Sequence, residues 1–214
     1  MKNKKAFTLT ELLVALGIIG AIAAMAIPSL LNSINNRIHA VQMKSFTQSM
    51  QELINNQLIK YKTKNLFETD FASIDTLLTD SNFDIAYLCT GTDTDSRACW
   101  ADTYTDINRK NNTCTLRNQK LTSHKNKKSA KLKSGLVFTV VNWTSNTKYV
   151  WVDVNGSDAP NICGRDVFGF LLLKEGKFEY VENSKNVSNT SECQGGDAGY
   201  CYKALVENNW VMPY

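Results

Sequence analysis

Residues 12–31 read LLVALGIIGAIAAMAIPSLL, an apolar run that predicts a membrane-spanning helix. A helix rises about 1.5 Å per residue, so a run of this length crosses the ~30 Å hydrocarbon core of a membrane. Lysines at positions 2, 4 and 5 precede the run, and the next basic residue is Arg37. Because positive flanks stay in the cytoplasm, we predict a single span with the C-terminal body outside the cytoplasm.

Glu11 stands immediately before the apolar run, and no other charged residue occurs until Arg37. A carboxylate in hydrocarbon costs ~3 kcal/mol even on a lenient scale, so we expect a function for it. A secretory signal peptide fits poorly, because the run is too long and lacks a small-x-small cleavage site followed by polar residues. A plain membrane anchor explains the length but leaves the acid unexplained. An anchor whose Glu11 meets a positive partner during assembly explains both.

The stretch Ala6-Phe7-Thr8-Leu9-Thr10-Glu11 is followed by Pro28 within the apolar run. In these residues the start of the chain resembles the N-terminal segment of type IV pilins and type II secretion pseudopilins. In that family a short basic leader is cut off before a Phe, the new N-terminus is methylated, and a Glu occupies the fifth mature position. The resemblance therefore implies a leader over 1–6, cleavage between Ala6 and Phe7, and N-methylation of Phe7. It also implies an assembly role for Glu11 and for the helix-kinking Pro28.

The resemblance further implies how such a subunit assembles. Cleavage would create an α-amino group four residues before Glu11, and this ammonium can neutralise Glu11 of a neighbouring subunit. An ion pair at low dielectric favours correct docking, because a charge left unpaired there is costly. The implied partners are other pilin-like subunits in a homo- or hetero-filament, a prepilin peptidase, an inner-membrane assembly platform and membrane lipid. The implied location is the bacterial inner membrane, and then a filament in the periplasm or at the cell surface.

Beyond the membrane segment, apolar residues continue at helical spacing, with polar residues between them. We predict one helix over residues 7–62, about 80 Å long, with a transmembrane part over 12–31 and an amphipathic stalk over 32–62. Pro28 removes one backbone hydrogen bond, so the helix should bend or loosen near Ala24. A coiled-coil dimer is the rival interpretation, although the apolar stripe is not a clean heptad repeat.

Residues 63–214 predict an extracytoplasmic globular domain, since 10% aromatic and 21% charged residues allow a buried core. Strand patterns occur at 136–141, 149–154, 167–173 and 178–181, and their short links predict an antiparallel meander. The stalk would cover one face of this small sheet, which gives an α+β fold class and agrees with the pilin-like fold that the resemblance implies. Loops or short helices are expected over 62–81, an irregular insertion over 90–134, and a disulfide-closed loop over 183–214.

Six cysteines follow the apolar run, and none belongs to a C-x-x-C pair. An even count beyond a membrane segment predicts export to an oxidising compartment and at least two disulfides. Buried free thiols in a reducing compartment are the alternative. The candidates allow fifteen pairings, so connectivity stays open. They are Cys89, Cys99, Cys114, Cys163, Cys193 and Cys201.

The segment 153–166 carries a candidate calcium site. Oxygen-bearing side chains alternate at Asp153, Asn155 and Ser157 as in the first half of an EF-hand loop, but Gly164 stands where that loop needs a Glu. The resemblance adds that some secretion pseudopilins bind calcium in a loop near the sheet. The hypothetical calcium ligands are Asp153, Asn155, Asp158 and Asp166. An Asn-Gly turn with Asx hydrogen bonds is the alternative explanation.

Catalysis has little support, because the chain has two histidines and no nucleophile-elbow or phosphate-loop motif. A net charge of only +4, and a lysine-rich stretch over 117–133 without aromatic residues, argue against nucleic acid as a partner. We predict a structural subunit and not an enzyme: a pseudopilin or minor pilin of a type II secretion-type system. A type IV pilus subunit for adhesion, motility or DNA uptake is one alternative, and a membrane-anchored extracellular binding domain is another.

Overall fold

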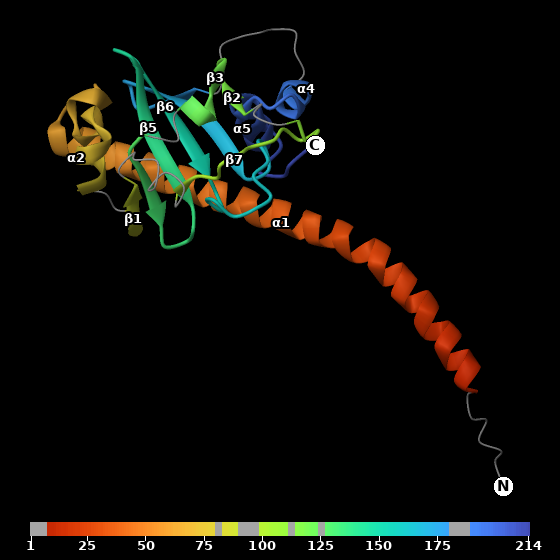
Figure 1. The fold of residues 1–214 in the computed structure, drawn as a ribbon. Helices are drawn as coiled ribbons and strands as arrows, with labels where there is room; N and C mark the ends of the chain where they lie inside the picture. Colours follow the sequence, from red (N-terminus) through yellow and green to blue (C-terminus); the bar gives the residue numbers. More distant parts are fainter. Residues whose placement is uncertain (1–7, 80–82, 90–98, 111–113, 124–126, 180–188) are drawn as a thin grey trace. The chain divides into compact units, whose positions relative to one another are not determined.

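The computed structural model describes residues 8–79, 83–89, 99–110, 114–123, 127–179 and 189–214. They belong to two compact units, one ending at Ile38 and the other running from His39 to Tyr214. Helix α1, Leu9–Tyr61, contributes to both units, and the chain stays helical on either side of Pro28 (Figure 1). The predicted long N-terminal helix is thus confirmed.

A six-stranded sheet forms the centre of the second unit (Figure 1). Its order is β1-β4-β5-β6-β7-β8, and every neighbouring pair is antiparallel. The bounds are Ile85–Cys89 for β1, Ser129–Leu132 for β4, Val137–Thr144 for β5, Thr147–Asp153 for β6, Val167–Leu173 for β7 and Phe178–Glu179 for β8. The predicted meander is confirmed as β5 to β8. β1 and β4 add two strands that the sequence pattern does not indicate, because both are short and β1 is mostly exposed.

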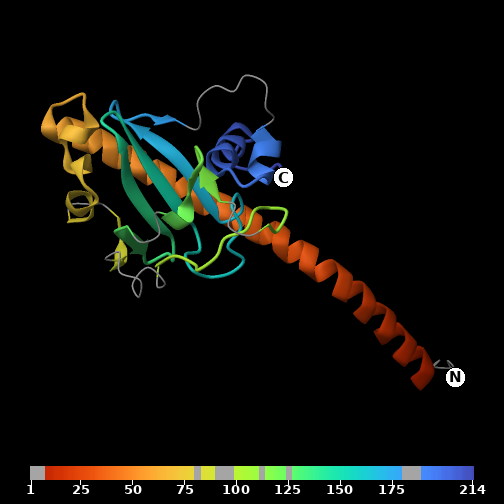
Figure 2. The same ribbon diagram turned by 45° about the horizontal axis from the view of Figure 1, so that its top comes forward.

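One face of the sheet packs against the part of α1 that belongs to the second unit (Figure 2). Successive residues of a strand point to opposite faces, so alternate residues such as Phe138 and Phe170 point toward the helix. They meet the buried side chains Met43, Phe46 and Met50 of α1, and the rings of Phe46 and Phe138 lie 5.2 Å apart. This packing of a helix on an antiparallel sheet confirms the α+β fold class.

The opposite face of the sheet is also buried, under the segment 99–123. Trp100 and Tyr104 of this segment lie fully buried with Trp151 of β6. The segment includes a two-stranded sheet of β2, Thr115–Leu116, and β3, Gln119–Lys120, followed by the 3-10 helix η3, Leu121–Ser123. The predicted irregular insertion over 90–134 therefore needs correction, since β2, β3 and β4 are regular and the segment is part of the core. Residues 90–98, 111–113 and 124–126 lie outside the described residues.

The C-terminal tail contains two helices, which corrects the predicted loop, whereas the predicted disulfide in the tail is confirmed between Cys193 and Cys201. Its helices are α4, Asn189–Gln194, and α5, Ala198–Glu207. The Asp197 side chain caps α5 by accepting hydrogen bonds from the amides of Gly199 and Tyr200. Tyr202 and Leu205 of α5 enter the core that α1 shares with the sheet. The tail folds this way because burial of these side chains outweighs the polar composition that suggests a loop.

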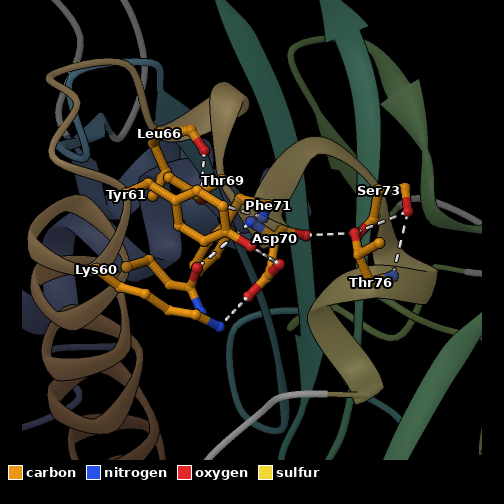
Figure 3. Close-up of polar contacts among 9 residues, drawn as sticks. Lys60, Tyr61, Leu66, Thr69, Asp70, Phe71, Ser73 and Thr76 are labelled. Carbon is orange, nitrogen blue, oxygen red and sulfur yellow. Dashed lines mark hydrogen bonds and ion pairs between the residues drawn. The ribbon is translucent and has the colours of Figure 1, made fainter.

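Short helices connect α1 to the sheet, as predicted for 62–81: η1, Leu66–Glu68, η2, Asp70–Ala72, and α2, Ile74–Thr79. Asp70 ties them to the end of α1 (Figure 3). Tyr61 Oη donates to Asp70 Oδ1 over 2.7 Å, and Lys60 Nζ lies 3.3 Å from Oδ2. The hydrogen bond from Tyr61 is the main cause that lowers the pKa of Asp70. Thr76 Oγ1 donates to the Asp70 carbonyl over 2.6 Å, which holds α2 in place.

Candidate functional site

The N-terminus of α1 is closed by reciprocal hydrogen bonds between Thr8 and Glu11. The Thr8 amide and hydroxyl both donate to Glu11 Oε2, over 2.8 and 2.9 Å, and the Glu11 amide donates to Thr8 Oγ1 over 3.2 Å. This is a capping box, which satisfies first-turn amides that have no partner within the helix. Its sequence signal, Thr-x-x-Glu before an apolar run, is present at residues 8–11 and gives Glu11 a local role that charge alone does not suggest. Ala6 and Phe7 lie outside the described residues.

The first unit exposes apolar side chains all around the helix. Leu13, Ile19 and Met25 are 61%, 63% and 81% exposed, and positions six residues apart on a helix differ by about 240° in direction. No single face is therefore polar. By length and composition α1 can cross a membrane. Because exposed apolar surface is unfavourable in water by roughly 25 cal/mol per Å², this segment needs lipid or other subunits around it.

A second candidate lies where β6 leads into β7. Asp153 is the last residue of β6 and Asp166 directly precedes β7, and both side chains are 0% exposed. They are brought together because Asp153 pairs with Val167 across the sheet. Among the described residues, neither carboxylate takes part in an ion pair.

Hydrogen bonds hold both carboxylate oxygens of Asp153 and one carboxylate oxygen of Asp166. Tyr104 Oη donates to Asp153 Oδ2 over 2.8 Å, and the Asn155 amide donates to Oδ1 over 3.3 Å. The Ile162 amide donates to Asp166 Oδ1 over 2.6 Å. Burial raises the pKa of Asp153 well above its usual value, and the nearby Asp166 raises it further. Burial also raises the pKa of Asp166, to about 7, against the opposing effect of the Ile162 amide.

Several oxygens around this pair are buried and have no hydrogen-bond partner in the part of the chain that the structure describes. They are Thr105 Oγ1, Asn155 Oδ1, Asn161 Oδ1 and Asp166 Oδ2. Buried polar atoms are nearly always satisfied in folded proteins, so such a group calls for a water or an ion.

The structure brings three of the four hypothetical calcium ligands together and places the fourth differently. Asp153, Asn155 and Asp166 belong to the cluster, whereas Asp158 is exposed and its backbone carbonyl accepts a hydrogen bond from Asn155 Nδ2 over 2.7 Å. Asn161 joins the cluster without any signal in the EF-hand-like spacing. No group of three or more His, Cys, Asp or Glu side chains suited to a metal occurs within the described ranges. A metal here would therefore need amide oxygens beside its two carboxylates.

All six cysteines are paired, and the structure supplies the connectivity. The disulfides join Cys89 to Cys99, Cys114 to Cys163, and Cys193 to Cys201. The first ties β1 to the beginning of the segment 99–123. The second ties the same segment to the β6–β7 loop, next to the Asp153–Asp166 pair.

The lysine-rich stretch over 117–133 is partly neutralised. Lys128 Nζ lies 2.6 Å from Asp75 Oδ1, and Lys133 Nζ lies 2.7 Å from Asp84 Oδ1. These pairs reduce the positive charge that the stretch presents to an anionic partner.

The N-terminal geometry agrees with a comparison against known families. Residues 1–27 match the family model of the prokaryotic N-terminal methylation motif. The chain carries a prepilin signature. Neither the curated proteins nor the solved structures contain a match to the chain.

The prepilin segment supports a type IV pilin-like or pseudopilin subunit, and so a structural role. It implies processing by a prepilin peptidase and assembly with other pilin subunits. Together with the apolar first half of α1, it is consistent with anchoring in the inner membrane. The match ends at residue 27, so the body that begins at His39 is described by the structure alone.

Proposed function

We propose that this chain is a subunit of a pilus-like filament, acting as a pseudopilin or minor pilin of a type II secretion-type system. The observation that carries the proposal is the prepilin segment, residues 1–27, in which Glu11 stands at the start of an apolar helix exposed on every side. Lipid covers this helix before assembly, and the helices of neighbouring subunits cover it afterwards. The subunit works by polymerising and not by turning over a substrate.

Assembly in this scheme depends on an exchange of partners at Glu11. In the single chain the carboxylate accepts hydrogen bonds from Thr8. Cleavage between Ala6 and Phe7 frees an α-amino group, and in a filament this ammonium from one subunit neutralises Glu11 of the next. At low dielectric an unmatched carboxylate is strongly unfavourable, so the pair sets register as well as affinity. Uncut chains should therefore stay as monomers in the membrane.

The architecture of the body favours a minor over a major subunit. The sheet is buried on both faces, and the second face is closed by a disulfide-linked segment in a chain of 214 residues. This is more structure than a repeating building block needs, and it suits a subunit that presents its own surface at one place in the filament.

Two variants separate the charge of Glu11 from its capping role. Glu11→Gln removes the charge but keeps an acceptor at N3, where Gln also forms a capping box. Thr8→Val removes the capping hydroxyl and keeps the charge. Both would be expressed with a prepilin peptidase and an assembly platform, and filaments would be sheared off and quantified, with cleavage checked by intact mass.

If the intermolecular pair drives assembly, Glu11→Gln is cleaved but yields few filaments, whereas Thr8→Val assembles. Normal filament yield from Glu11→Gln, together with failure of Thr8→Val, would show that Glu11 serves only as a helix cap. Abundant filaments of subunits that still carry Met1–Ala6 would also refute the proposal.

A further inference from the structure

We propose that the edge of β5 beyond the end of β4 binds an extended, acidic segment of a partner protein, which adds to the sheet as a further strand. This edge comprises Val140, Val141 and Asn142. It lies in the second unit, and its occupancy does not require the filament assembly proposed above.

The first argument is a step in the sheet. β4 pairs with β5 only as far as Phe138, whereas β6 pairs with β5 as far as Thr144. Within the described part of the chain, residues 139–144 of β5 therefore have a neighbouring strand on one side only. An unpaired strand edge is a template for pairing with another chain.

The main-chain groups of Val140 and Asn142 point toward this open side. The Leu132 amide donates to the Leu136 carbonyl over 2.7 Å, which sets the register between β4 and β5. In an antiparallel pair every second residue directs both its amide and its carbonyl to the same neighbour, so Val140 and Asn142 direct theirs to the β4 side. Among the described residues, no main-chain hydrogen bond reaches either of them from that side. An added strand would supply these missing bonds.

A hollow that is open to solvent lies along the same edge. It is lined by Val140, Val141 and Asn142 of β5, by Ser73 and Ile74 at the start of α2, and by Lys127 and Lys128 before β4. The aliphatic side chains form an apolar floor, and the two lysines form a basic rim. In strand addition the main-chain bonds supply affinity and such side-chain pockets supply specificity. An extended segment with apolar and acidic residues fits both parts of the hollow.

The charge of the rim favours an acidic partner. Lys127 is exposed and forms no ion pair among the described residues, whereas Lys128 Nζ lies 2.6 Å from Asp75 Oδ1. No acidic side chain is among the residues that line the hollow. Complementary charge steers a partner to a surface, and like charge excludes a wrong partner.

A further positive charge lies directly behind the edge. Lys148 of β6 is only 5% exposed, and its Nζ donates to the Ala72 carbonyl over 3.0 Å and to Asn142 Oδ1. No carboxylate in the described ranges forms an ion pair with Lys148. Buried charges in folded proteins are usually paired. A carboxylate that entered the hollow beside Asn142 would supply this counter-charge.

Two other arrangements fit the observations less well. The outer edge of the sheet at β1 is also open, but its ladder with β4 shifts register between Ile85 and Tyr87, and such a shift blunts an edge against pairing. Single-stranded nucleic acid would use the lysines, but the lining of the hollow offers no aromatic side chain on which a base could stack.

Fluorescence anisotropy of the full-length protein in non-ionic detergent tests the site, with a labelled heptapeptide of alternating Val and Glu as the probe. We expect saturable binding that weakens as the NaCl concentration rises, and no binding of the matched peptide with Lys in place of Glu. Lys127→Glu should weaken binding severalfold, because it replaces an attraction by a repulsion. Lys120→Glu is the matched control, since this exposed lysine of β3 does not line the hollow and should leave binding unchanged.

Two N-methylated forms of the probe distinguish strand addition from attraction of charge alone. One form carries methyl groups on the amides of its Val residues, and the other carries them on the amides of its Glu residues. Each form blocks one edge of an added strand, and β5 would pair with only one edge, so one form should bind and the other should not. Hydrogen exchange of the segment 137–144 should slow when the probe is bound, while exchange of the segment 167–173 stays unchanged.

Several results would overturn the inference. They are a lack of binding by the Val–Glu probe, equal binding of the Lys-containing peptide, equal affinity of the two methylated forms, and equal affinity of Lys127→Glu and Lys120→Glu for the probe. Protection of β1 in place of the segment 137–144 would overturn it as well. Cross-linking of two copies of the chain through Lys127 without the probe would identify a second copy as the occupant and would also contradict the proposal.

Discussion

Replacing the Cys114–Cys163 bridge by two alanines should be the most destabilising of the three possible disulfide deletions. This bridge joins residues 49 apart in the sequence, whereas the Cys193–Cys201 bridge joins residues only 8 apart. A cross-link stabilises the fold mainly by restricting the unfolded chain, and the effect grows with the length of the loop that it closes.

The loop lengths give the expected magnitudes. In the chain-entropy treatment, closing a loop of 49 residues contributes about 4 kcal/mol at 25 °C. Closing a loop of 8 residues contributes about 2.5 kcal/mol in the same treatment. The two double-alanine variants should therefore differ by about 1.5 kcal/mol in their free energy of unfolding. Both bridges are buried, so the packing lost with the sulfur atoms is similar and largely cancels in the comparison.

Urea unfolding of the full-length chain in non-ionic detergent measures this difference. Trp100 and Trp151 are fully buried in the cluster beside Cys114, so their fluorescence reports loss of the covered sheet face. Double variants are needed, because a single replacement leaves a free thiol that can mispair. Equal unfolding free energies for the two variants, or greater damage from deleting Cys193–Cys201, would refute the argument from loop closure.

Three further perturbations follow from particular contacts. Gly164→Ala should lower the free energy of unfolding by about 2 kcal/mol or more, because Gly164 has a φ of +92° and an added Cβ would lie 2.5 Å from Cys201 Sγ. Thermal unfolding of the oxidised variant and of the parent chain measures this loss. Tyr61→Phe should cost about 1 kcal/mol and raise the pKa of Asp70 toward its usual value, which an NMR titration of that carboxyl would detect. Burial lowers the pKa of His39, so the folded state favours its neutral form. The stability that neutral His39 contributes is fully present above pH 6.5, and it is lost as the pH falls through the lowered pKa of His39 in the folded state. A His39→Gln variant should lose this pH dependence of stability, which unfolding measurements at pH 7.5 and pH 5 would show.

The strands show where local sequence patterns are sufficient. β5 to β8 are evident from runs of β-branched and aromatic residues separated by short turns. β4 has only four residues, and β1 presents three exposed side chains in a row, so neither carries a period-two apolar pattern. Each becomes a strand because a neighbour supplies the ladder: β1 pairs with β4, and β4 pairs with β5. Strands of this kind are decided by pairing and not by their own composition.

The calcium hypothesis shows the same limit at a site. The alternation from Asp153 to Ser157 draws attention to the β6–β7 loop, but spacing along the chain suggests Asp158 as readily as Asn161. In the folded chain Asp158 faces solvent, while Asn161 lies against Asp166. Sequence distance therefore does not predict which oxygens meet, because the loop folds back on itself and on Tyr104.

The sequence by itself determines the N-terminal helix, with its apolar run and its capping box. Continuous apolarity, basic residues on one flank, and Thr8 and Glu11 at capping-box spacing act within one helix, where neighbours in sequence are neighbours in space. The tertiary structure alone decides the pairing of Cys114 with Cys163, the covering of the second sheet face and the meeting of Asp153 with Asp166. These depend on contacts between segments far apart in the chain, and such contacts form only where burial outweighs the entropy of closing the loops between them.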